Sequence, residues 1–598
     1  MKLKWGRSDM PPYSHATNRP KDGKKTLKRV LSFVKEYKLV IFAALVMSFI
    51  SNVLSLMGPS LAGNAINEAS AGAGKVNFAK VVYYVKLMLV VYISSSVITI
   101  VINVIMTIVA KGTAKKLRAE CFEKLSRLKV SFFDNNQAGD IISRVSYDVD
   151  VIATSLQTDI VHIMTSFVTV IGALIMMVRI APILSVVVLV TIPISVSYTV
   201  FVKKKTRPLF INRSKCYGKM NGFVEEMFSG CKTIQAYAYE NQVCQKFETV
   251  NGNASEAYYK ADSIGVTIGP TMGMINNISL ALIATLGSFF YMMNLVSLGQ
   301  ISSFILYSRK FSGPINEIAN IMNEILSALS AAERVFNLLD QEEEVSDRTL
   351  ATDLVNVQGD VKFNDVSFGY TKDKTILHNL SFEALPGRLT AIVGPTGAGK
   401  TTMINLLMRF YDYNDGSIFV DGKEHLDYKR TSLRKAYAMV LQDTWLFRGT
   451  VFENIAYGCE GATMDDVVKA AKKAHVHSFI MRLPLGYDTI ISEDGGNISK
   501  GQKQLLTIAR AMLYDSKMLI LDEATSNVDT NTEREIQDAM RELMHDKTCF
   551  VIAHRLSTIS NADTILVLDH GDVVEQGTHR QLMEKKGFYY KLYASQYE

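Results

Sequence analysis

The first half of the chain is marked by long stretches without a charged residue. They cover residues 39–67, 87–110, 160–178, 180–202 and 263–308. Because about 20 apolar residues suffice to cross the hydrocarbon layer of a bilayer, each of the first four stretches predicts one transmembrane helix. The last stretch is long enough for two helices joined by a polar turn near residues 294–300. The pattern predicts six transmembrane helices, because buried helices of a soluble protein, the alternative, rarely run so far without charge.

Basic residues are unevenly distributed between these stretches. Lysine and arginine are frequent in residues 1–38, in residues 111–157 and directly after residue 202, whereas the other connections hold almost none. The excess of basic residues on one side predicts a multi-pass protein of the plasma membrane with both termini in the cytoplasm. Within residues 26–38, apolar residues alternate with lysines at helical spacing. This segment is expected to form an amphipathic helix on the inner membrane surface.

The connections after the second and fourth spans are much longer than a helical hairpin requires. They keep helical periodicity, so we expect spans two to five to extend into the cytosol and to turn back near residues 133–139 and 206–208. An acidic run at residues 340–344 reads as a linker, with a solvated charge run without further role as the alternative. The predicted domains are a basic tail with an amphipathic helix (1–38), an all-α six-helix transmembrane domain (39–330), a linker (331–358) and a soluble α/β domain (359–598).

Composition adds one exclusion. The chain has 598 residues and a net charge of only +7, with 65 basic against 58 acidic side chains. This excess is too small for a chain of this size to indicate a nucleic-acid-binding protein. The expected partners are a lipid bilayer and a small-molecule, lipid or peptide substrate, and no nucleic acid.

A phosphate-binding motif lies in the soluble segment, between an apolar strand pattern and a helical pattern. Residues 394–401 read Gly-Pro-Thr-Gly-Ala-Gly-Lys-Thr and match G-x-x-x-x-G-K-[ST]. In such a P-loop, backbone N–H groups surround the phosphates, the lysine reaches the β- and γ-oxygens, and the threonine binds Mg²⁺. The motif predicts an ATP site made of Gly394, Pro395, Thr396, Gly397, Ala398, Gly399, Lys400, Thr401 and Thr402.

A second motif supports the first. Residues 518–523 form an apolar run that ends in two carboxylates, the form of a Walker B strand. Asp522 is expected to hold Mg²⁺, and Glu523 is placed to act as the base toward the attacking water. The two motifs together predict an enzyme that hydrolyses ATP.

Further motifs give the chain a family resemblance. They are Tyr370 ahead of the P-loop, Gln442 in Val-Leu-Gln-Asp, residues 498–502 as Ile-Ser-Lys-Gly-Gln, residues 526–529 as Ser-Asn-Val-Asp, and His554 in Ala-His-Arg. In order and spacing, over nearly the whole chain, the sequence resembles a half-transporter of the ABC exporter family. The six-span half agrees, including Phe-Phe-Asp at 132–134 and Ala-Glu-Arg-Val-Phe at 332–336.

The resemblance implies roles for these positions. Tyr370 stacks on adenine, Gln442 contacts Mg²⁺ and the attacking water, and His554 hydrogen-bonds the γ-phosphate. The residues that the resemblance assigns to an ATP bound by another nucleotide domain are Ser499, Lys500, Gly501 and Gln502, and it adds Asp529 after the Walker B strand. Two such domains enclose two ATP molecules, so the functional unit is a dimer.

One departure from the family pattern refines this expectation. The family signature reads Leu-Ser-Gly-Gly-Gln, whereas this chain carries Lys500 where a glycine lets backbone approach the phosphate. The base Glu523 and His554 are intact. Heterodimeric exporters combine an altered signature in one subunit with a missing base in the other, so the resemblance implies a heterodimer with one competent and one degenerate site. A homodimer that tolerates the altered signature is the alternative.

The membrane half also holds a few polar and charged residues. Polar candidates for a transport cavity are Arg309, Lys310, Asn276, Asn277 and Glu317. A charge that faces lipid costs at least about 2.5 to 3.5 kcal/mol, so Arg309 and Lys310 are expected to face water or to pair with neighbouring spans. Family resemblance implies multidrug-type export of amphipathic drugs or lipids. The alternatives are a peptide exporter and an ATP-gated channel or sensor of the same architecture.

Overall fold

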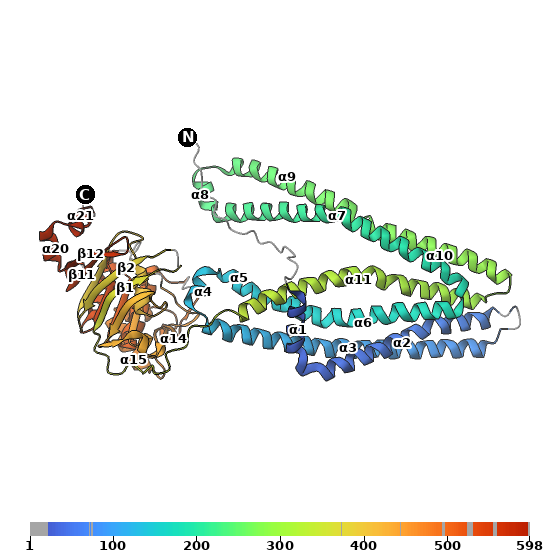
Figure 1. The fold of residues 1–598 in the computed structure, drawn as a ribbon, viewed down its shortest axis with the longest axis horizontal. Coiled ribbons are helices and arrows are strands. Elements are labelled where there is room, and N and C mark those ends of the chain that lie inside the picture. The colour runs from blue at the N-terminus through green and yellow to red at the C-terminus, as the bar shows by residue number, and fades with distance from the viewer. Residues whose placement is uncertain are drawn as a thin grey trace. The chain divides into compact units, whose positions relative to one another are not determined.

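A computed structural model of the chain describes residues 22–595 except for residues 71, 73–75, 372–373, 443, 493–496, 523–529 and 554–558. It divides the chain into two units (Figure 1). The first contains residues 1–127 and 136–342, and the second contains residues 128–135 and 343–598. The short segment 128–135 therefore belongs with the second unit although it interrupts the first in sequence.

The described residues of the first unit form helices joined by short turns. The helices are α1 (Gly23–Val34), α2 (Lys38–Ala69), α3 (Phe78–Arg127), α5 (Ala138–Ser143), α6 (Val149–Ile180), α7 (Pro182–Ser229), α8 (Cys231–Ala236), α9 (Glu240–Gly265), α10 (Ile268–Met292) and α11 (Leu298–Leu339), with a 3-10 turn at Lys35–Tyr37 and a π-helical turn at Arg144–Asp148. The amphipathic helix expected at residues 26–38 corresponds to α1 and the turn after it.

Five helical segments in the described chain are long and apolar enough to cross a membrane. They are Gly23–Ala69, Phe78–Arg127, Ala138–Ile180, Pro182–Ser229 and Glu240–Met292. The sixth expected span coincides with α11, which contains Arg309 and Lys310 and is not among these five segments of the described chain. α11 is 42 residues long and begins with a capping box in which Ser297 and Gln300 exchange hydrogen bonds.

Helices α2, α3, α6 and α11 pack against one another. Phe304 and Tyr307 of α11 are fully buried, and the Tyr307 hydroxyl donates to the backbone oxygen of Leu56 in α2 over 2.5 Å. A buried hydroxyl without a partner would cost free energy, so this hydrogen bond fixes α11 against α2.

Helices α7 and α9 run side by side, and the short helix α8 lies between them in the chain, where it reverses direction. Together they form an arm, here defined as residues 203–265 (Figure 1). The turn that we expected at residues 206–208 is absent, because α7 continues through Pro208 to Ser229 and the chain reverses at Gly230. A proline removes one N–H and bends a helix without necessarily ending it. The arm exposes several large apolar side chains: Ile211, Tyr217, Phe228, Tyr237 and Tyr259.

The second unit is an α/β domain. Its strands are β1 (Val361–Phe368), β2 (Leu377–Ala384), β3 (Leu389–Val393), β4 (Asp415–Val420), β5 (Lys423–Glu424), β6 (Tyr437–Val440), β7 (Gly449–Thr450), β8 (Ile490–Ile491), β9 (Met518–Asp522), β10 (Thr548–Ile552), β11 (Thr564–Asp569) and β12 (Asp572–Gly577). Its helices are α4 (Val130–Asn135), α12 (Lys400–Leu407), α13 (Arg430–Lys435), α14 (Val451–Ile455), α15 (Met464–Lys473), α16 (His477–Ile480), α17 (Lys500–Tyr514), α18 (Thr530–Met544), α20 (His579–Lys585) and α21 (Phe588–Ser595).

Two sheets form the core of this domain. One has the order β2-β1-β4-β5, and the other has the order β12-β11-β3-β10-β9-β6, in which β11, β3, β10, β9 and β6 are parallel. The central strand β10 is buried at every position. The carboxyl ends of parallel strands meet at one edge of a sheet, which is where ligands bind in open α/β folds.

The acidic segment after α11 is held by arginines of the second unit. Arg430 and Arg434 form ion pairs with Asp347 and Glu344, at 3.2 and 2.5 Å. Arg430 is buried, and a buried guanidinium requires such partners. Glu344, the last residue of the acidic run, is therefore a structural ion-pair partner, which the alternative of a merely solvated run did not include.

Candidate nucleotide site and membrane path

The P-loop connects the end of β3 to the start of α12. Gly399 caps α12 with a φ of +101°, and a Cβ at this position would lie 2.6 Å from the Leu377 side chain. A Cβ at Gly394 would lie 2.2 Å from the backbone oxygen of Leu568. Glycine is needed at both positions because the conformation and the close backbone approach exclude larger residues. The result is a loop that opens directly into the N-terminus of α12, a geometry suited to phosphate.

The Lys400 side chain turns back over this loop. Its Nζ donates to the backbone oxygens of Gly394 and Pro395 over 2.8 and 3.0 Å. Burial lowers the pKa of Lys400, whereas the Asp522 carboxylate raises it. Thr401, at the start of α12, is exposed, while Thr402 is buried. The ammonium group and the Thr401 hydroxyl are thus available at the mouth of the loop.

Asp522 lies at the same edge of the sheet. Ile552 of β10 pairs with Ile392 of β3 on one side and with Asp522 of β9 on the other. Asp522, the last residue of its strand, therefore lies level with Ile392, two residues before Gly394. Gln442 follows β6, whose last residue is in register with the residue before Asp522, so three chain segments bring a lysine, a carboxylate and an amide to one edge.

Tyr370 adds an aromatic ring beside α12. Its side chain is 44% exposed, and its hydroxyl donates to Thr402 Oγ1 over 3.3 Å and accepts from Asn405 Nδ2 over 3.1 Å. The ring also meets the edge of Tyr411 at a centroid distance of 4.9 Å. Sequence reasoning missed Asn405 and Tyr411. Asn405 could have been found from its helical spacing to Thr402. Tyr411 could have been found from the aromatic pair that follows α12.

The altered signature forms the N-terminus of α17. Ser499 is its cap, and Ser499 and Gln502 exchange two hydrogen bonds in a capping box. Ile498 packs on the core of the domain, so the change from leucine is accommodated. Lys500 is exposed and Gly501 is buried. The lysine therefore projects from the end of the helix where the partial positive charge of the helix dipole lies.

Three predicted site residues, Glu523, Asp529 and His554, lie outside the described residues. Their roles remain predictions that rest on the sequence. β9 ends at Asp522, and β10 ends two residues before His554.

The polar residues predicted for the transport path differ in their surroundings. The Lys310 ammonium donates to the Ser55 backbone oxygen over 2.8 Å and to its Oγ over 2.6 Å, and lies 5.9 Å from the Tyr92 ring. Arg309 is exposed, Asn276 is half-buried and Asn277 is exposed. The Glu317 side chain is outside the described part of the chain. Lys310 is thus occupied by helix packing, whereas Arg309 presents its charge outward.

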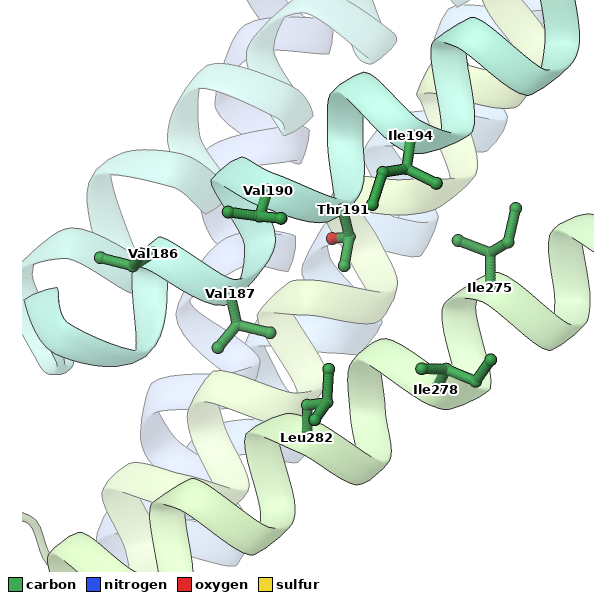
Figure 2. Close-up of a pocket in the computed structure, with 8 residues that line it drawn as sticks. All are labelled: Val186, Val187, Val190, Thr191, Ile194, Ile275, Ile278 and Leu282. Carbon is green, nitrogen blue, oxygen red and sulfur yellow. The ribbon is translucent and has the colours of Figure 1, made fainter.

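An apolar groove of about 440 Å³ lies between α7 and α10. Figure 2 shows the side chains that face it from the two helices: Val186, Val187, Val190, Thr191 and Ile194 from α7, and Ile275, Ile278 and Leu282 from α10. Neither Arg309 nor Lys310 lines this groove. Its only polar lining side chain is Thr191, so the groove suits hydrocarbon.

Comparisons with known proteins agree with this arrangement. Residues 41–315 match the ABC transporter transmembrane region, and residues 377–526 match the ABC transporter domain. The chain is 42% identical over 578 residues to an uncharacterised ABC transporter ATP-binding protein, YfiC of Bacillus subtilis, covering 97% of this chain and 95% of that protein. It is 41% identical over 517 residues to a fatty acid ABC transporter ATP-binding/permease protein of Mycobacterium bovis, covering 86% and 82%.

A solved structure of a bacterial Atm1-family ABC exporter with ATP bound is also similar. It has a TM-score of 0.75 and 29% sequence identity, over 94% of this chain and 98% of that chain. Both halves of the molecule are therefore matched, in the same order. The chain belongs to the ABC transporter family, as an ATP-hydrolysing membrane exporter with one transmembrane domain and one ATP-binding domain in a single polypeptide.

Proposed function

We propose that this chain exports amphipathic drugs or lipids out across the plasma membrane, with both of its termini in the cytoplasm. The observation that carries the proposal is the apolar groove between two membrane helices (Figure 2). A groove lined almost entirely by aliphatic side chains favours an acyl chain or the apolar body of a drug over a polar peptide. The similarity to a protein named as a fatty acid transporter supports the same class of cargo.

The proposed ATP site combines the P-loop, residues 394–402, with Tyr370. The adenine stacks on the exposed Tyr370 ring, and Lys400 leaves the loop carbonyls to reach the β- and γ-phosphates. Thr401, Asp522 and Gln442 would hold Mg²⁺, because hydroxyl, carboxylate and amide oxygens are the ligands that this ion prefers. Bound Mg²⁺ would neutralise charge on the transferred phosphoryl group.

Glu523 and His554 complete the hydrolytic set, as base toward the attacking water and as hydrogen-bond donor to the γ-phosphate. Gln502 and Asp529 belong to the two motifs that flank the Walker B strand. ATP binding then closes two nucleotide domains, and hydrolysis with phosphate release resets them. Each closure would turn the membrane path outward.

The proposed assembly is a heterodimer with a second half-transporter. Ser499, Lys500 and Gly501 would face the ATP held by the partner subunit, where the ammonium group of Lys500 occupies space that glycine leaves to the phosphate. The partner's intact signature would serve the ATP held by this chain. One site is then competent and the other binds ATP with little turnover.

The first prediction concerns the chain purified alone. We expect its ATPase rate to be at least about tenfold below that of the chain purified with its partner, because every site of a homodimer would face Lys500 in place of glycine. The measurement is phosphate release by each preparation in lipid nanodiscs. Lys500→Gly should raise the rate of the chain alone, and the exposed residue Lys472→Gly is the control. Vigorous hydrolysis by the unmodified chain alone would favour the homodimer.

The second prediction concerns Arg309. An exposed guanidinium in a membrane helix is costly unless it meets water or an anion, so we propose that it contacts the polar end of the cargo. Arg309→Ala is expected to reduce ATP-driven uptake of a fluorescent fatty acid into inside-out vesicles by about tenfold, while basal ATPase persists. Lys310→Met is the matched comparison, because loss of the Ser55 contact should lower thermal stability. Unchanged uptake by Arg309→Ala would remove this residue from the path.

A further inference from the structure

The ring expected to stack on adenine belongs to a loop, and a helix holds its far end. Tyr370 lies two residues after the end of β1, and its ring meets Phe368 and Tyr411 edge-to-face, at centroid distances of 5.1 and 4.9 Å. Its hydroxyl bonds to Thr402 Oγ1 over 3.3 Å and to Asn405 Nδ2 over 3.1 Å, and both partners belong to α12. Edge-to-face pairs and hydrogen bonds both depend on geometry, so these four contacts set the orientation of the ring.

The helix that holds the hydroxyl also carries the proposed phosphate site. α12 begins directly after the P-loop, with Gly399 as its cap and Lys400 as its first residue. Thr402 and Asn405 are three positions apart, a spacing that places two side chains on the same face of a helix. One rigid element therefore holds both the groups expected to bind the phosphates and the ring expected to stack on the base.

We propose that Asn405 is a positioning residue that holds the Tyr370 ring at a fixed place relative to the P-loop, so that the site binds the base and the triphosphate of one nucleotide together. In this role Asn405 touches neither the base nor the phosphates and acts only through the Tyr370 hydroxyl. A ring whose hydroxyl is already held loses less conformational freedom when a base stacks on it, which favours binding. This inference rests on the proposed nucleotide site.

Of the four contacts to the ring, the one from Asn405 can be removed with the least disturbance. Phe368 is buried in the core of the domain, and Tyr411 packs against that core. Thr402 belongs to the proposed ATP site itself. Asn405 is half-buried, and leucine at this position keeps the size of the side chain and has a higher helix propensity than asparagine. Asn405→Leu therefore removes the hydrogen bond without weakening α12.

The test separates binding of the base from binding of the phosphates, in the full-length chain with its partner in nanodiscs. Asn405→Leu is expected to raise the KM for ATP about fivefold, the scale of one neutral hydrogen bond. The kcat should stay within about twofold, because the base and the γ-phosphate are at opposite ends of ATP. Inorganic tripolyphosphate carries the phosphates without a base, so its inhibition constant against ATP hydrolysis should also stay within about twofold. Asn561→Leu, at an exposed asparagine of the same domain, is the control and should leave all three values unchanged.

Companion variants decide between explanations. Tyr370→Phe removes the hydroxyl and should raise the KM for ATP at least as much as Asn405→Leu does. Adding Asn405→Leu to Tyr370→Phe should change nothing further, because the bond between the two side chains is already absent. An unchanged KM in Asn405→Leu, additive losses in the double variant, or equal losses of affinity for ATP and tripolyphosphate would overturn the positioning role. Tyr370→Ala should raise the KM for ATP, and an unchanged KM there would overturn the proposed stacking of adenine on Tyr370 itself.

Discussion

Replacing Lys400 with alanine is expected to lower ATP turnover by roughly 10²–10³-fold, the scale seen when one preorganised donor to a developing anion is lost. In the present structure the ammonium group is held by the backbone oxygens of Gly394 and Pro395. It is therefore held beside the loop, and it exchanges these carbonyl oxygens for phosphate oxygens when ATP binds. Its removal takes away the only lysine of the P-loop, residues 394–401, and with it the charge that meets the β- and γ-oxygens.

Binding and folding must be measured separately for this variant. ATP stabilises a protein in proportion to its occupancy, so the ATP-dependent rise in melting temperature should disappear in Lys400→Ala while the melting temperature without ATP changes little. Lys429→Ala removes an exposed lysine that pairs with Asp353 at 2.8 Å and serves as the control. If Lys400→Ala kept the unmodified rate of ATP hydrolysis, the proposed ATP site at the P-loop would be contradicted.

The second large effect is expected for Glu523→Gln. Loss of a general base costs about 10²–10⁴-fold in rate, while the amide keeps the size of the side chain, so ATP should still bind. Uptake of amphiphiles into inside-out vesicles should then stop after at most one closure of the nucleotide domains. An ATP-gated channel would behave differently, because its passive flux needs binding and opening without repeated hydrolysis.

The control for this variant is Glu542→Gln, which removes an exposed carboxylate of α18. It should hydrolyse ATP and transport at the unmodified rate. Flux that survives in Glu523→Gln would show that the chain gates a passive path. Uptake of a peptide in preference to a fluorescent fatty acid by the unmodified chain would favour the peptide-exporter alternative.

The features that could be predicted from the sequence are those fixed by local chemistry. A P-loop needs glycines at set positions and a strand before a helix, and the register of β3, β10 and β9 then places Asp522 at the same edge. The transmembrane helices could be predicted because the hydrocarbon layer excludes charged side chains over the whole length of a helix. The turn between α10 and α11 could be predicted too, because polar residues interrupt the apolar stretch there.

The remaining features depend on contacts between distant residues. Tyr411 and Asp134 are 277 positions apart, and no local pattern predicts their hydrogen bond. Arg309 and Lys310 are adjacent and chemically alike, yet only Lys310 finds Ser55, 255 positions away. The prediction of a turn at residues 206–208 was wrong for another reason. Proline weakens a helix locally, but the helix-forming residues on both sides outweighed this loss of stability.

The uncovered arm, residues 203–265, has a consequence for production of the protein in the cell. Its exposed side chains include Phe228, Tyr237 and Tyr259, which are 77%, 79% and 73% accessible. An apolar surface of this kind on an unassembled chain promotes aggregation and recognition by chaperones and proteases. In the proposed heterodimer, synthesis of this chain in excess over the second half-transporter would therefore be wasteful, and coordinated translation of both would be advantageous.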